Sequence, residues 1–171
     1  MKPFQAAAGS TLFFFLVPGI VAGLLPWWIG RSTAHPVSWP VQGLGLVVGL
    51  TGLALLLRCF ADFVRARGTP APAAPTERLV VEGPYRFVRN PMYLAVVTAI
   101  LGQTLWWGSP WTLLYAALVW VVVASFVRFY EEPTLRRQFG PGYDIYRAAV
   151  PAWIPRVRAW SGDPGRTEGP P

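Results

Sequence analysis

Polar side chains that could do chemistry gather in two short stretches of an otherwise apolar sequence. The first runs from Gly83 to Tyr93 and combines arginines and tyrosines with two prolines, Pro84 and Pro91. Each proline disfavours the α region for the residue before it, so Gly83 and Asn90 are expected to be extended. Pro91 also suits the first turn of a helix, whose free N–H groups and partial positive charge can meet a carboxylate or a polar ligand edge.

The second stretch, residues 128–140, places carboxylates at the end of a long apolar run. Arg128, Glu131 and Glu132 are spaced i, i+3 and i+4, which puts them on one face of a helix. Pro133 permits a bend there. Carboxylates opposite a basic, aromatic loop at the edge of the lipid could bind a cationic, partly apolar ligand. The plainer interpretations are a salt-bridged surface helix for this stretch and an interfacial anchor for the first.

The elements that would position these stretches are membrane helices. Hydrophobic residues make up 53% of the sequence and charged residues 13%, and the apolar residues lie in blocks. The chain is therefore predicted to be an all-α, polytopic membrane bundle of about four transmembrane helices, with a C-terminal helical hairpin and a helical cytoplasmic tail. A single domain is expected over residues 1–160, with a disordered tail over residues 161–171. The four spans are expected near residues 11–29, 41–60, 91–107 and 110–128.

Local signals refine this arrangement. Pro18 is expected to kink the first helix, and residues 26–28, Pro-Trp-Trp, are expected to mark its end at an interface. Gly45 and Gly49 form a small-xxx-small pair that predicts close helix packing, within the chain or between chains, so the oligomeric state stays open. The three residues 108–110 between the last two blocks force an antiparallel hairpin. Residues 68–76 resemble an extended linker, and residues 79–81 a short extended piece.

The charge pattern indicates a membrane topology, not a nucleic-acid partner. The net charge is +7, but the basic residues flank the apolar blocks and form no basic domain. With both termini inside, every Lys and Arg except Arg31 lies on one side, which is therefore the cytoplasmic side. The first helix is expected to be uncleaved. Because Cys59 and His35 are each the only residue of their type, neither a disulfide nor a metal site is predicted.

Taken in order, the polar stretches resemble the isoprenylcysteine carboxyl methyltransferase and phospholipid methyltransferase superfamily. The family pattern has a Gly-Pro-Tyr-Arg, Arg-His-Pro-x-Tyr loop, a helical hairpin, a Glu-Glu pair, Phe/Tyr-Gly-x-x-Tyr-x-x-Tyr and a closing Val-Pro-Arg-Trp-Ile-Pro. The resemblance covers about the C-terminal half of the chain. The matching segments are Gly83–Tyr93, Glu131-Glu132, Phe139–Tyr146 and Val150–Pro155.

The resemblance implies S-adenosylmethionine as methyl donor, held at the cytoplasmic ends of the last two helices, and a lipophilic acceptor in the membrane. It implies that Glu131 binds the amino group of the cofactor and that Arg128 orients the acceptor. The compact size and the Ala/Arg/Pro-rich composition suggest a bacterial inner membrane. The residues implied to line the cofactor pocket are Leu79, Val80, Tyr85, Asn90, Pro91, Met92 and Tyr93.

Two positions depart from the family pattern. Asn90 stands where the family usually has histidine, which excludes a histidine base at this position. Ala152 replaces the usual arginine of the closing motif. A carboxylate acceptor needs no base, whereas an amine acceptor must first lose a proton. The absence of an obvious base near the loop therefore favours a carboxylate or similar acceptor on a lipid-like substrate.

Two other functions are compatible with the same residues. A sterol-type membrane reductase resembles this family near its C-terminus but uses NADPH, so binding of a dinucleotide and not of S-adenosylmethionine would favour it. A non-catalytic membrane protein could keep the scaffold for lipid binding or assembly. The replacements at Asn90 and Ala152 support this third hypothesis, and it predicts that loss of Glu131 has no effect on ligand binding.

Overall fold

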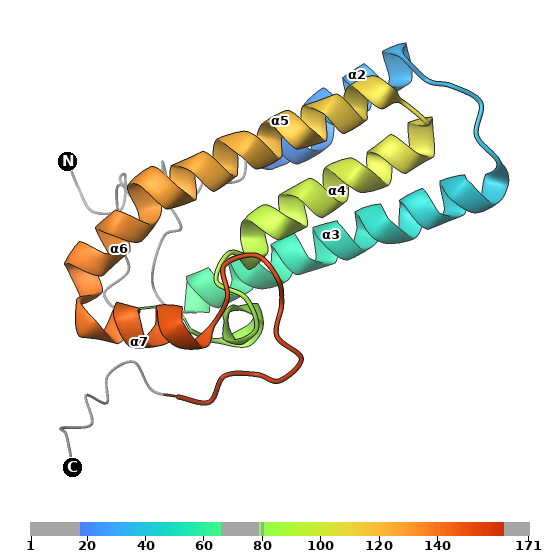
Figure 1. Ribbon diagram of the computed structural model, residues 1–171. Helices are drawn as coiled ribbons and strands as arrows, with labels where there is room; N and C mark the ends of the chain where they lie inside the picture. Colours follow the sequence, from blue (N-terminus) through green and yellow to red (C-terminus); the bar gives the residue numbers. More distant parts are fainter. Residues whose placement is uncertain (1–17, 66–78, 80, 163–171) are drawn as a thin grey trace, which may run out of the picture.

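A computed structural model describes residues 18–65, 79 and 81–162, and every regular element in this part of the chain is helical. The all-α prediction is confirmed to that extent. The long elements lie side by side as a bundle, α2 runs along α5, and α6 and α7 lie at one end of the bundle (Figure 1). In chain order, the elements are η1 (Gly19–Leu24), α2 (Leu25–Ser32), α3 (Trp39–Arg65), η2 (Gly83–Arg86), α4 (Pro91–Trp107), α5 (Pro110–Phe126), η3 (Val127–Glu131), α6 (Glu132–Phe139) and α7 (Pro141–Ala149).

Two helical runs in the described part are long and apolar enough to cross a membrane. They are Trp39–Asp62 in α3 and Pro110–Phe139, which joins α5, η3 and α6. Much of their apolar surface is exposed; Leu44 is 54% and Leu118 59% exposed. Exposed apolar surface of this extent suits lipid and not water. The helix α4 has 17 residues and lies between these two runs.

Sequence signals explain where α4 and α5 begin and end. Pro91 and Pro110 each occupy the first turn of a helix. Gly108, with φ of 61°, ends α4 in a left-handed conformation that suits glycine, and the Ser109 side chain caps α5 by accepting a hydrogen bond from the Thr112 N–H at 3.2 Å. The two helices run antiparallel across this short connection (Figure 1).

Glycines let α3 and α4 approach each other closely. A Cβ atom on Gly45 would lie 2.8 Å from the Gly102 carbonyl oxygen, and one on Gly52 would lie 2.8 Å from the Ala95 carbonyl oxygen. A Cβ atom on Gly102 would in turn clash with the backbone of Gly49. The predicted small-residue packing is thus confirmed, and it occurs within the chain.

The N-terminal part of the described chain packs against α4 and α5. Its core contains Ala22, Val96 and Ala116, and the Tyr115 hydroxyl donates a hydrogen bond to the Val21 carbonyl at 2.9 Å. A π-helical turn, η1, directly follows Pro18. The helix continues to Ser32, three residues beyond the expected end at residue 29, because Pro26 lies in the first turn of α2 and removes no helical bond there. Residues 11–17 of the first expected span lie outside the described residues.

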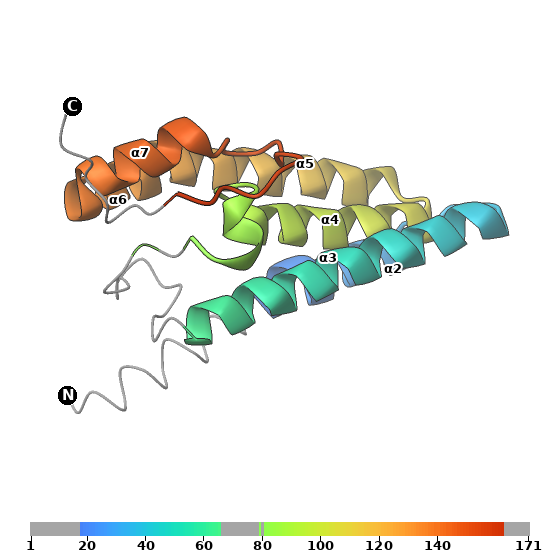
Figure 2. The ribbon, with the colours of Figure 1, turned by 90° about the horizontal axis from the view of Figure 1, so that it is seen from below.

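The two polar stretches meet at one end of the bundle, called here the polar end. It is formed by the end of α3, η2, the start of α4, α6, α7 and residues 150–162 (Figure 2). The opposite end carries Trp106, Trp107 and Trp111 in and beside the α4–α5 connection. The bundle therefore serves to bring Gly83–Tyr93 and Glu131-Glu132 together, although they are far apart in the sequence.

Candidate functional site

The basic loop folds as a tight turn followed by a helix start. Its first part is the 3-10 turn η2, and its last residue before α4 is Asn90, with φ −118° and ψ 51°. The prediction that Gly83 is extended is wrong, because its φ is 53°, in the left-handed region. The buried Asp62 carboxylate packs against Gly83, so a side chain there would clash with Asp62 as well as strain the backbone.

The carboxylate of Glu131 meets the loop at Tyr93. The Tyr93 hydroxyl donates a hydrogen bond to Glu131 Oε2 at 2.8 Å, and Tyr93 lies in the first turn of α4. Glu131 ends the π-helical turn η3, which interrupts the α-helical register of this run. The spacing that was expected to put Arg128 on one face with both glutamates therefore does not hold: Arg128 is exposed, whereas Glu131 is half-buried.

Glu132 is committed to a separate network. Arg89 Nη1 donates to Glu132 Oε1 at 2.7 Å and to the Tyr143 hydroxyl at 3.2 Å. Arg147 Nη2 lies 3.6 Å from Glu132 Oε2. The side chains of Arg89 and Glu132 are each only 11% exposed, so this pair joins the loop to α6 and α7 in a partly dry environment. Glu131, by contrast, has no basic partner within the described residues.

The segment after α7 closes over the loop. Its backbone exchanges hydrogen bonds with the loop at Arg89 N to Pro151 O and at Arg156 N to Phe87 O, both 2.9 Å. Asn90 Nδ2 donates to the Ala152 carbonyl at 3.1 Å. The two positions that depart from the family pattern are thus in direct contact. This contact uses the backbone of Ala152, so it does not depend on the missing arginine side chain.

A cluster of tyrosines forms the floor of the polar end. The Tyr146 hydroxyl donates to the Tyr85 carbonyl at 2.7 Å, and Tyr143 and Tyr146 are both buried. Burial raises the pKa of Tyr85 and of Tyr146 well above the usual value, so both hydroxyls remain protonated at neutral pH. Leu79 packs against this cluster, whereas Val80 lies outside the described residues.

The structure thus gathers most of the predicted site around the first turn of α4. Tyr85, Asn90 and Pro91 are buried there, Met92 is half-buried, and Tyr93 contacts Glu131. Sequence reasoning missed the inward role of Arg89, because the plainer interpretation of its stretch was an interfacial anchor. Its partner Glu132 lies 43 residues further along the chain. The sequence indicated this pair only in that a basic motif and an acidic motif were both expected at the same end of the helices.

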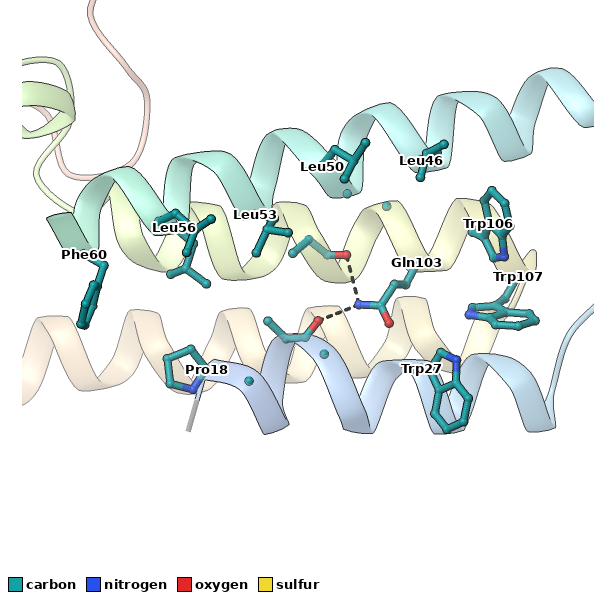
Figure 3. A pocket seen from close by; sticks show the side chains of 18 residues that line it. Pro18, Trp27, Leu46, Leu50, Leu53, Leu56, Phe60, Gln103, Trp106 and Trp107 are labelled. Carbon is teal, nitrogen blue, oxygen red and sulfur yellow. Dashed lines mark hydrogen bonds between the residues drawn. The ribbon is translucent and has the colours of Figure 1, made fainter. Parts of the chain in front are cut away.

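An apolar groove lies between α3 and the η1–α2 segment, with α4 as its floor. Its volume is about 550 Å³ (Figure 3). Leucines of α3 such as Leu50 and Leu53 form one wall, and Trp27 lies on the other. Among the described residues that line the groove, Gln103 is the one with an amide side chain, and its Nε2 donates to the Ala22 carbonyl at 2.6 Å. A groove of this size and polarity suits an alkyl or isoprenoid chain.

Comparison with known proteins places the chain in a family. A sequence model of the family "Phospholipid methyltransferase" matches residues 44–142, more than half of the chain. The chain is 26% identical over 132 residues to "Protein-S-isoprenylcysteine O-methyltransferase B" of Arabidopsis thaliana, covering 77% of this chain and 61% of that protein. It is 34% identical over 80 residues to "Protein-S-isoprenylcysteine O-methyltransferase" of Schizosaccharomyces pombe, covering 46% and 34%.

The chain therefore spans less than two thirds of the length of each of these relatives. The matched segment 44–142 includes most of α3, the loop, α4, α5 and both glutamates, so the contact between Tyr93 and Glu131 lies inside the region that the family shares. The ordered motifs and the family match agree, and the chain belongs to the phospholipid methyltransferase family of membrane methyltransferases.

Proposed function

We propose that this protein is an integral-membrane methyltransferase that uses S-adenosylmethionine to methylate a lipophilic acceptor. The contact between Tyr93 and Glu131 carries this proposal. It holds a carboxylate without a basic partner among the described residues, beside the start of α4. A carboxylate in a poorly solvated site attracts a cation, and the methyl donor carries both an ammonium and a sulfonium group.

The cofactor would lie around the first turn of α4, with Glu131 binding its amino group. The helix leaves the N–H groups of Met92 and Tyr93 without helical partners, so these can bind the donor's polar edges. Tyr85, Asn90 and Pro91 would form the adjoining wall, and Leu79 and Val80 would complete it. The amide nitrogen of Asn90 is engaged by Ala152, which leaves its oxygen as the group that can accept a hydrogen bond from a ligand.

The cofactor supplies an electrophilic methyl group, and the residues of the chain align the acceptor and exclude water. The relatives are named as O-methyltransferases of S-isoprenylcysteine. We propose an isoprenylcysteine-type carboxylate or a lipid headgroup as acceptor, with its apolar chain in the groove of Figure 3. The exposed Arg128, three residues before Glu131, would orient the acceptor's polar end. A carboxylate needs no base, in keeping with Asn90 in place of histidine.

The proposed topology has four membrane crossings with the polar end in the cytoplasm. The helix α4 lies between α3 and the run Pro110–Phe139 that begins with α5, both of spanning length, so it would cross the same layer with its 17 residues and a locally thinned bilayer. The polar end carries Arg58, Arg86, Arg89 and Arg128, which the positive-inside rule places in the cytoplasm. Both termini would then be cytoplasmic, in a bacterial inner membrane.

A methyl-transfer assay tests the reaction. The purified protein is incubated with S-adenosylmethionine carrying a labelled methyl group and with either an S-prenylcysteine or a phosphatidylethanolamine. Label in a base-labile methyl ester of the S-prenylcysteine would support a carboxylate acceptor, and label in the amine headgroup a lipid acceptor. A folded protein that transfers label to neither acceptor would favour the non-catalytic scaffold. Binding of NADPH in its place would favour the reductase.

A further inference from the structure

A second pocket, distinct from the groove of Figure 3, lies at the polar end of the bundle. It has a volume of about 660 Å³ and is bounded by the end of α3, by η2, by the start of α4 and by the segment after α7. Two arginines from different elements line it together with apolar side chains. The residues that matter to its chemistry are Leu55, Arg58, Arg86, Phe87 and Leu94.

The two arginines give this pocket an excess of positive charge. Arg58 Nε donates to Asp62 Oδ2 at 3.2 Å, so one carboxylate balances one guanidinium group. Arg86 Nε instead donates to the Trp160 carbonyl at 2.6 Å, a neutral partner, and within the described residues Arg86 forms no ion pair. That bond fixes the guanidinium while leaving its Nη atoms to bind an anion.

The pocket changes from charged to apolar along its depth. Leu55 lies one turn before Arg58 in α3, and Leu94 lies one turn after Pro91 in α4. Both leucines therefore lie deeper in the bundle than the arginines, and Phe87, 36% exposed, lines the same pocket. A ligand that satisfies both parts has an anionic head and an apolar chain that points into the membrane.

We propose that this pocket binds the phosphate headgroup of an anionic membrane phospholipid between Arg58 and Arg86, with the start of an acyl chain against Leu55 and Leu94. The pocket shares Pro91 with the wall of the proposed cofactor site, but Tyr93, Glu131 and Arg128 do not line it, so it is a second site beside the first. The segment after α7 contributes Pro155 and Ala159 to the pocket and pairs with the loop through Arg156 and Trp160. A bound lipid would therefore brace the loop that carries Asn90 and Tyr93.

Lipid binding to the detergent-purified protein, measured by native mass spectrometry, tests the proposal. The probes are phosphatidylglycerol, which is anionic, and phosphatidylcholine, which has the same phosphate but no net charge. The wild type is expected to retain phosphatidylglycerol in preference to phosphatidylcholine. The Arg58→Gln, Arg86→Gln double variant is expected to bind phosphatidylglycerol at least about tenfold more weakly, the effect of losing charge-assisted hydrogen bonds.

Two controls make the result decisive. Arg137→Gln removes the same charge from an exposed position whose hydrogen bonds stay within α6, and it should leave the lipid preference unchanged. If the double variant does not fold, Arg58→Gln alone is measured, because that side chain is 54% exposed and the Arg86–Trp160 bond stays intact. Equal retention of phosphatidylglycerol by wild type and variant would overturn the proposal. Displacement of the lipid by an equal concentration of inorganic phosphate would also overturn it, because the site would then be one for free anions.

Discussion

At the scale of single residues, the two glutamates of one motif have different tasks. Glu132 is held by Arg89 and Arg147, whereas Glu131 accepts only the Tyr93 hydroxyl among the described residues. One carboxylate thus stabilises the arrangement of α6, α7 and the loop, and its neighbour remains able to bind a cationic ligand. The sequence pair Glu-Glu therefore combines a structural residue with the residue that we propose binds the cofactor.

The Arg89–Glu132 pair is predicted to be a large contributor to stability. Arg89→Gln would leave a carboxylate that is 11% exposed with only the longer contact to Arg147, and breaking a partly buried pair in this way costs about 3 kcal/mol. Arg136→Gln is the matched control: its partner Asp144 is 44% exposed, and the loss should be below about 1 kcal/mol. Thermal unfolding in detergent measures both variants. Equal shifts in Tm would contradict the assignment.

The Tyr93 hydroxyl is predicted to orient Glu131 for the cofactor. Tyr93→Phe removes the 2.8 Å hydrogen bond while keeping the ring, and the affinity for S-adenosylmethionine should fall by about three- to tenfold. Tyr130→Phe removes a hydroxyl from a side chain that is 49% exposed and should leave the affinity unchanged. Titration calorimetry compares the two variants. Unaltered binding by Tyr93→Phe would mean that Glu131 needs no such orientation.

At the scale of elements, the contact between α3 and α4 holds the site in place. Gly45, Gly52 and Gly102 allow the backbones to touch, and α4 begins with the residues that line the candidate cofactor site. Any change that separates these helices would also move Pro91 and Tyr93 relative to Asp62 and Gly83. Close backbone packing is therefore a condition for the geometry of the polar end.

Gly52→Ala is predicted to destabilise the bundle, because its Cβ atom would lie 2.8 Å from the Ala95 carbonyl oxygen. Overpacking against backbone costs about 1–3 kcal/mol, because neither helix can yield without moving the whole contact. Gly43→Ala lies on the same helix with nothing within 4 Å of the new methyl group, so it should be neutral or slightly stabilising. Unfolding by heat or by denaturing detergent measures the stability of both variants. Equal stability would refute the close contact.

The elements differ in how far the sequence could predict them. The bounds of α4 match the expected 91–107 because Pro91 and Gly108 mark both ends, and α5 begins at Pro110 as expected. The π-helical turns η1 and η3 were not predicted, because no residue pattern marks the insertion of one residue into a helical turn. The contacts of Arg89 with Glu132 and of Asn90 with Ala152 join residues far apart in the chain, and only the folded arrangement defines them.

At the scale of the whole molecule, the apolar groove and the polar end have different proposed functions. The groove between α3 and α2 suits the apolar chain of an acceptor, and the polar end offers Glu131 to the methyl donor. Changes in the groove should therefore affect the acceptor and spare the cofactor. This separation is testable with variants whose new side chain fills the groove without disturbing the packing of the helices.

Gly23→Leu is predicted to obstruct the acceptor, because Gly23 lines the groove and nothing lies within 4 Å of its Cβ position. The KM for a prenylated acceptor should rise at least about tenfold while affinity for S-adenosylmethionine is kept. Gly43→Leu is the control, since it adds the same side chain on α3, outside the residues that line the groove. An unchanged KM in Gly23→Leu would place the acceptor chain elsewhere.

The most direct test of the central claim is titration calorimetry of S-adenosylmethionine into the detergent-purified protein, beside Glu131→Gln and Glu82→Gln. Glu82 is an exposed carboxylate at the start of the loop, so its neutralisation controls for loss of charge alone. We expect saturable binding by the wild type and by Glu82→Gln, and at least about a tenfold loss of affinity in Glu131→Gln. Equal affinity in Glu131→Gln, or no binding by a folded wild type, would contradict this claim.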